Sequence, residues 1–269
     1  MAIQLLLRSR CWAVALLVAL VGAEENDPCE CLNWKQVYDS HRVFCGEGLE
    51  FHVFEGALGY DLPGISFIET NFKGIYDQFC TNFFKRMDNR YCVNIGMYPY
   101  GMPSMYAGQW CYVSKACTEL NGGKAVADKK ASGVGGWLSG EEPAALPRDL
   151  SWKVCVAGRD NRLRDLAPPD LLDLATRLGA EAGYVTKIAY PRLMPPEHTW
   201  ASVQEAVAKG DDASMPEALR AAIAARVPIV IDEDPTAIGN QKIIFGREVY
   251  DLVNTTGWPY QRGKDVGEL

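Results

Sequence analysis

The chain has 269 residues, of which 48% are hydrophobic and 23% charged, and its formal net charge is −7 at pH 7. This composition is that of an ordinary globular protein, which excludes disordered and collagen-like chains. The excess of acidic residues argues against a nucleic-acid partner and against a polybasic protein of the membrane surface.

The first 23 residues have the pattern of a secretory signal peptide. Two arginines precede an apolar run over 11–21, and small residues continue to Ala23. The run is too short to span ~30 Å of hydrocarbon, so we expect cleavage after Ala23; an uncleaved anchor is the alternative. No second long apolar run follows. We therefore expect a secreted or extracellular protein with no stable membrane span after cleavage, with the lumen of the secretory pathway as the alternative location.

Cleavage would leave eight cysteines, because Cys11 is one of the nine in the sequence. An even number in an exported chain is typical of a disulfide set. A zinc site beginning at Cys29-Glu30-Cys31 is the alternative, but zinc sites usually recruit histidines and more widely spaced cysteine pairs. We therefore expect no metal and four bridges, whose connectivity the sequence does not decide. The eight residues are Cys29, Cys31, Cys45, Cys80, Cys92, Cys111, Cys117 and Cys155.

Residues 24–157 are predicted to form a small disulfide-stapled module with one central helix. Apolar and aromatic residues recur at three- and four-residue steps from Phe72 to Met87, which is one face of a helix that includes Cys80. Strands are predicted over 91–95 and 110–113.

A glycine-rich stretch near 122–150 is predicted to be a flexible segment or an insertion within this module. Cys155 lies beyond it, and its partner must lie upstream because no cysteine follows. The module boundary is therefore expected after Cys155.

A loop rich in glycine and proline, over 96–106, separates the two predicted strands. It contains Tyr98, Tyr100 and Tyr106, and large rigid rings on a braced loop are suited to stack on a sugar or to anchor a protein. The alternative is that these rings fill a small core. We take the three tyrosines as candidate ligand-binding residues for an unknown protein or glycan.

Residues 158–269 contain no cysteine and are predicted to form a small α+β domain. Capping and turn residues define its elements. In chain order they are a helix over 168–178 closed by Gly179, a helix over 200–209 closed by Gly210, a helix that begins in the capping box Ser214-Met215-Pro216-Glu217 and continues through Ala225, a strand over 227–231, and strands over 242–245 and 249–253 joined by Gly246-Arg247.

Catalytic residues are not identified by any motif, and no cofactor is expected. Cys45, flanked by His41 and His52, suggests a Cys-His nucleophile, but a free thiol would leave an odd number of cysteines to pair. The acidic run Asp232-Glu233-Asp234 offers hard oxygen ligands for a cation; a solvated acidic turn is the preferred interpretation. Asn254 lies in the sole N-glycosylation sequon.

Five segments between residues 29 and 155 resemble those of uncharacterised secreted cysteine-rich proteins of unicellular algae. The resemblance implies export and disulfide bridges, and it supplies no activity, substrate or catalytic residue. The segments are Cys29-Glu30-Cys31-Leu32-Asn33-Trp34-Lys35, Cys45-Gly46-Glu47-Gly48, Gly108-Gln109-Trp110-Cys111-Tyr112-Val113, Leu120-Asn121-Gly122-Gly123 and Ser151-Trp152-Lys153-Val154-Cys155.

The sequence therefore favours a secreted extracellular binding protein of unknown ligand. A secreted hydrolase whose active site lacks a motif, or a structural component of a wall or matrix, are the alternatives.

Overall fold

The structure is a computed structural model that describes residues 27–52, 76–96, 101, 105–130, 145–193, 198–233 and 240–252. Its fold is mixed α+β, with a disulfide-stapled module followed by a further α+β region, which confirms the expected fold class. The predicted signal peptide and Asn254 lie outside the described residues.

The first sheet is antiparallel and is centred on two strands that are buried along almost their whole length. The strands predicted over 91–95 and 110–113 both belong to it, although the first is shorter than expected. In sequence order its strands are β1 (Val93–Asn94), β2 (Gln109–Ser114), β3 (Lys124–Ala125) and β6 (Leu150–Val154), arranged as β1-β2-β6-β3. Two further strands, β4 (Lys129–Lys130) and β5 (Ala145–Leu146), form a separate antiparallel pair.

The aromatic segment before β1 does not form the continuous helix predicted over 72–87. In its described part, Asp77–Thr81 form a π-helical turn (η1) and Phe84–Arg86 a 3-10 turn (η2). Phe83 interrupts the helical path with φ −130° and ψ −79°, and its ring packs edge-on against Tyr184 at a centroid distance of 5.3 Å. Tertiary packing of the rings therefore overrides the local helical periodicity.

The described α-helix of this region is the short α1 (Trp34–Asp39). Asn33 caps its first turn by accepting a hydrogen bond from the Gln36 amide at 3.1 Å. The helix places Trp34 in an aromatic core, with its ring edge-on to Trp110 at 4.9 Å. Cross-linked aromatic packing thus replaces a long helix as the centre of the module.

Two consecutive helices, α6 (Pro168–Leu178) and α7 (Ala182–Ala189), pack against each other, and α7 packs against β1. The prediction for α6 is confirmed at both ends. Proline occupies its first turn, and it ends at Gly179, whose φ of 60° lies in the left-handed region that favours glycine.

The second sheet has the order β10-β9-β8-β7, with β7 parallel to β8 and the other pairs antiparallel. Strands β9 and β10 form the predicted hairpin, in which Gly246 takes the first turn position with φ 62°. The strands are β7 (Arg192–Leu193), β8 (Ile229–Asp232), β9 (Gln241–Phe245) and β10 (Glu248–Leu252).

Helices α8 (Trp200–Lys209) and α9 (Glu217–Ala224) follow β7 in the chain. The first confirms its prediction, but the capping box predicted at Ser214 is wrong. The Ser214 hydroxyl donates to the Asp211 carboxylate at 2.5 Å within a preceding 3-10 turn, so α9 begins after Pro216 without a side-chain cap. None of the described helices combines the length and the apolar character needed to cross a bilayer.

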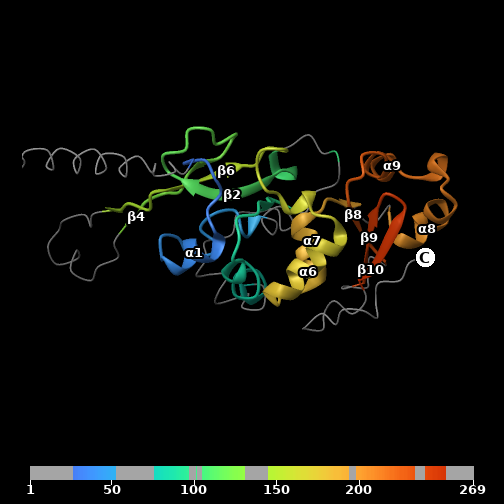
Figure 1. The fold of residues 1–269 in the computed structure, drawn as a ribbon, viewed down its shortest axis with the longest axis horizontal. Helices are drawn as coiled ribbons and strands as arrows, with labels where there is room; N and C mark the ends of the chain where they lie inside the picture. Colours follow the sequence, from blue (N-terminus) through green and yellow to red (C-terminus); the bar gives the residue numbers. More distant parts are fainter. Residues whose placement is uncertain are drawn as a thin grey trace, which may run out of the picture.

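Alternate residues of the second sheet face two different apolar clusters. Val230 and Ile243 belong to the first cluster, which also contains the cystines and residues of α6 and α7, whereas Ile229 and Ile244 belong to the second, with residues of α8 and α9. Figure 1 shows the corresponding order along the long axis: first sheet, α6 and α7, second sheet, α8 and α9. The boundary expected after Cys155 stays a prediction, and the first cluster extends across it.

Candidate functional site at the base of the 96–108 loop

Strands β1 and β2 bring the two ends of the predicted tyrosine loop together. Asn94 pairs with Gln109 in the ladder, and beyond this pair the Ile95 amide donates to the Gly108 carbonyl at 3.1 Å. The intervening chain, 96–108, is therefore closed at its base by main-chain hydrogen bonds.

The candidate tyrosines lie mostly outside the described residues. Tyr98 and Tyr100 are not described, and of Tyr106 only the backbone is, in the 3-10 turn η3 (Met105–Ala107). Two other positions of the loop are exposed: a Cβ on Gly101 would meet no atom within 4 Å, and Met105 is 40% exposed. Gly101 and Met105 thus lie at the surface, and the role of the tyrosines stays a prediction.

All eight predicted cysteines form disulfides, and Cys155 pairs upstream as expected. Because Cys45 is bridged, it is not the free thiol that a Cys-His nucleophile requires. Two of the bridges hold the loop base, since Cys92 directly precedes β1 and Cys111 lies in β2. The pairs are Cys29–Cys117, Cys31–Cys111, Cys45–Cys80 and Cys92–Cys155.

The two bridges at the loop base lie against each other. The sulfurs of Cys31, Cys92, Cys111 and Cys155, the sulfur cluster, are all within 4.8 Å of one another and buried. Between the bridges, the Sγ atoms of Cys31 and Cys92 are 3.5 Å apart and those of Cys111 and Cys155 are 3.7 Å apart. One compact cluster therefore ties both ends of the loop to the N-terminal segment and to the end of β6.

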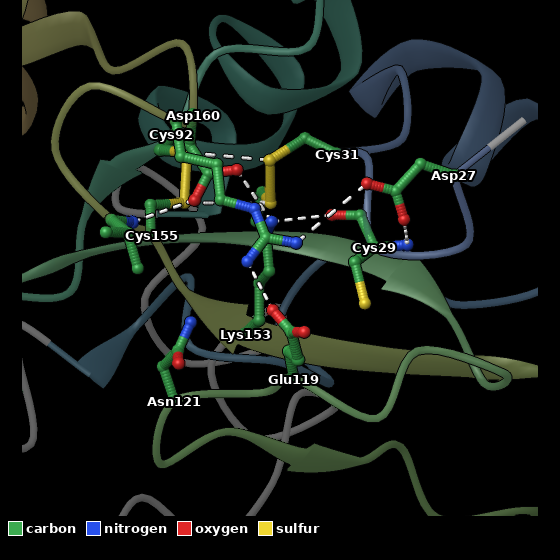
Figure 2. Close-up of polar contacts among 12 residues, drawn as sticks. Asp27, Cys29, Cys31, Cys92, Glu119, Asn121, Lys153, Cys155 and Asp160 are labelled. Atoms are coloured by element: carbon green, nitrogen blue, oxygen red, sulfur yellow. Dashed lines mark hydrogen bonds and ion pairs between the residues drawn. A yellow bond between two sulfur atoms is a disulfide. The ribbon is translucent and has the colours of Figure 1, made fainter.

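A buried ion pair lies beside the sulfur cluster (Figure 2). Lys153 is opposite Cys111 in the β2–β6 ladder, and its ammonium donates to Asp160 at 2.6 Å and to the Cys29 carbonyl at 2.5 Å. The side chains of Lys153 and Asp160 are 2% and 7% exposed. The second Asp160 oxygen accepts from the Val156 amide at 2.8 Å. Because each charge is desolvated, loss of either partner would leave the other without compensation.

The charged side chains next to this buried pair are exposed to solvent. Arg159, which is 47% exposed, contacts Glu119 and lies 4.0 Å from Asp27; both acidic residues border the cysteines in Figure 2. Exposed ion pairs contribute little to stability. The buried pair, rather than these surface contacts, is therefore the charged group that fixes the chain around the cluster.

A second polar network joins the loop base to the end of α7. The Asn94 side-chain oxygen accepts from Gln109 Nε2 at 2.9 Å and from Arg164 at 2.8 Å. The Asn94 amide donates to the carbonyls of Lys187 and Tyr190, both at 3.1 Å. The sequence did not predict this network, because a single amide at Asn94 or Gln109 carries no periodic signal.

Glu50 is a buried carboxylate that sequence analysis also missed. One oxygen accepts from the hydroxyls of Tyr38 at 2.7 Å and Tyr112 at 2.8 Å, and the other accepts from the Gly48 amide at 2.9 Å. Burial raises the pKa of Glu50, an effect that the tyrosine hydrogen bonds oppose. Burial also raises the pKa of Tyr38 and Tyr112. Glu50 thus anchors α1 to β2.

Asp232, the first residue of the predicted acidic turn, is the last residue of β8 and is largely shielded from solvent. Asp232, whose side chain is 14% exposed, contacts Arg192 and lies 3.8 Å from the Lys187 ammonium. Burial lowers the pKa of Lys187, and Arg192 lowers it further. Asp234 lies outside the described residues. Within the described chain, the sulfur cluster is the group of His, Cys, Asp or Glu side chains close enough to share a metal.

No protein-family model, curated protein or solved structure matches this chain. The resemblance of residues 29–155 to secreted algal proteins stays a prediction. The feature of the described chain that offers a candidate site is the loop base, where two buried cystines and the Asn94 network hold both ends of the loop.

Proposed function

We propose that the protein is a secreted binding protein whose contact surface is the 96–108 loop. Tyr98, Tyr100 and Tyr106 provide the recognition rings, and the ligand is a protein or a glycan. Rings of this size bury a large area with few rotatable bonds, and tyrosine is enriched among the residues that dominate binding energy.

The observation that supports this proposal is the covalent and hydrogen-bonded closure of the loop base. Cys92 and Cys111 sit at its two ends and join the same sulfur cluster. Fixing both ends reduces the conformational freedom that a ligand would otherwise have to remove. The exposed Gly101 and Met105 agree with a loop that is accessible to a partner.

The disulfide bridges also support the proposed extracellular location. Four buried disulfides are typical of an oxidising environment, where thiols do not stay reduced. Together with the signal-peptide pattern of residues 1–23, they support export.

The test is the triple variant Tyr98→Ala, Tyr100→Ala, Tyr106→Ala, compared with the wild type on glycan and protein arrays. We expect lost binding with an unchanged melting temperature, since each recognition ring contributes on the order of 1–2 kcal/mol to binding. Unaltered binding, or a large fall in melting temperature, would show that the rings are not a recognition surface.

Two control variants identify the cause of any loss. The triple tyrosine-to-phenylalanine variant keeps the rings and removes the hydroxyls, so stacking predicts retained binding. Tyr190→Ala truncates a fully buried ring and shows how a core tyrosine changes the melting temperature in the same assay.

A further inference from the structure

The sulfur cluster has nearly the dimensions of a tetrathiolate metal site. A tetrahedral zinc ion with Zn–S bonds of about 2.3 Å holds its sulfurs about 3.8 Å apart. Two contacts between the bridges, Cys31 with Cys92 and Cys111 with Cys155, are 3.5 and 3.7 Å. The other pairs of sulfurs also lie within 4.8 Å. Only the two bonded pairs would have to separate substantially to surround an ion.

We propose that these four cysteines, once reduced, bind one zinc ion, so that the cluster has a disulfide state and a metal state that exclude each other. Sulfur ligands favour zinc and other thiophilic cations over magnesium or calcium. This metal site is additional to the binding function of the loop and does not depend on it.

The conversion needs an external dithiol or phosphine reductant. Each disulfide takes up two electrons and two protons and becomes two thiols, while the reductant is oxidised. Zinc then replaces the thiol protons, which are released to solvent, and a dianionic tetrathiolate site remains. A disulfide oxidant reverses the process: it removes the electrons, re-forms both bridges and expels the metal.

Three of the four positions are held by backbone contacts that do not involve sulfur. Cys111 belongs to β2, which is paired on both sides by β1 and β6. The Cys92 amide donates to the Asn161 carbonyl at 2.8 Å, and the Cys155 amide donates to the Gln109 carbonyl at 2.7 Å. Reduction of the bridges therefore leaves an arrangement of main-chain bonds that keeps these sulfurs together.

The other two bridges provide an internal control. Cys29–Cys117 and Cys45–Cys80 contribute no atom to the group of sulfurs that could share a metal. A specific site therefore distinguishes four cysteines from the other four in the same reduced chain, whereas adventitious binding does not.

The experiment uses the full mature chain, reduced by a phosphine without oxygen and divided into samples with and without one equivalent of zinc. Free thiols are alkylated and mapped by mass spectrometry. We expect zinc to slow the alkylation of the sulfur cluster several-fold and to leave Cys29, Cys45, Cys80 and Cys117 unchanged. Protection of all eight residues alike, or of none, would overturn the proposal.

Cobalt substitution gives a second readout. The reduced wild type should show the visible ligand-field bands of tetrahedral tetrathiolate cobalt at one ion per chain. Cys45→Ser with Cys80→Ser removes a bridge outside the cluster and should keep these bands. Cys31→Ser with Cys111→Ser removes a bridge inside it and should lose them. Equal spectra from the two variants would contradict the assignment, and the alkylation pattern of the wild type decides the matter if either fails to fold.

Discussion

Residues 27–157 and 158–252 reach stability by different means. The first region contains all four bridges, which span 88, 80, 35 and 63 residues of chain. Its described backbone is largely irregular, with short strands and isolated helical turns. The second has no cysteine and consists of helices and a four-stranded sheet that bury alternate side chains in two clusters. The difference shows that cross-links support irregular backbone, whereas regular, well-capped elements are held by packing.

The largest effect that would test this contrast is reduction of all four bridges. Each contributes about 2–4 kcal/mol through its restriction of the unfolded chain. In limited proteolysis with dithiothreitol, we expect cleavage within 27–157 first, and longest survival of peptides from the second cluster, which includes α8 and α9. Simultaneous loss of both regions would show that the shared first cluster makes them one cooperative unit.

The buried ion pair gives the next largest effect. Lys153→Met leaves Asp160 buried without its cation, so we expect a loss of about 3–5 kcal/mol in the free energy of unfolding, measured with denaturant. The double variant Lys153→Met, Asp160→Asn should recover much of it, because asparagine is neutral and its oxygen still accepts from the Val156 amide. A double variant no more stable than the single one would argue against charge burial as the cause.

Loss of the Asn94 network should lower the free energy of unfolding by less than loss of the ion pair does. The network lies where the two regions meet. Asn94→Ala removes one of the two acceptors of Gln109 Nε2 and the side-chain donor to the Lys187 and Tyr190 carbonyls, so we expect a destabilisation of about 1–3 kcal/mol. Asn161→Ala, at an exposed side chain, is the control and should change stability by less than about 0.5 kcal/mol. Equal effects of the two variants would mean that the network does not join the regions.

The smallest effect concerns pH. Because burial raises the pKa of Glu50, the folded state binds this proton more tightly than the unfolded chain. The resulting stabilisation is complete below the ordinary carboxyl value of 4.5 and is lost as pH rises through the raised pKa. Glu50→Gln should flatten that decline, by at most about 1.4 kcal/mol per pH unit.

Denaturant unfolding over a pH series measures this difference. Glu119→Gln, at a side chain that is 59% exposed, is the matched control and should follow the wild-type profile. If Glu50→Gln and the wild type gave parallel curves, proton uptake at Glu50 would not contribute to stability.

Sequence patterns predicted the elements whose ends depend on neighbouring residues. Helix α6 and the β9–β10 hairpin were predictable because a proline, a left-handed Gly179 and a Gly246 turn act within a few residues. The capping box at Ser214 failed because Asp211 competes for the same hydroxyl. A local rule is reliable only where no nearby group competes.

Features that depend on distant residues were not predictable. The disulfide pairing requires knowledge of which strands are neighbours, and the helix predicted over 72–87 was interrupted by aromatic packing on Tyr184. Lys153 sits in a strand whose sequence gives no indication of the Asp160 side chain that makes its burial possible. For the candidate site, the sequence predicted bridges at both ends of the loop. It did not predict that the two bridges contact each other, nor the Asn94 network.

The alternation of the second sheet has a consequence for the order of synthesis. Val230, Ile243 and Leu252 complete the apolar cluster to which Cys31 and Trp34 belong. The cystine half therefore lacks part of its core until strands β8, β9 and β10 have been synthesised. Disulfides that form earlier form in a chain whose apolar core is incomplete, and they can join the wrong cysteines. We therefore expect oxidative folding of this chain to depend on a disulfide isomerase that can reopen such bridges after the later strands have been made.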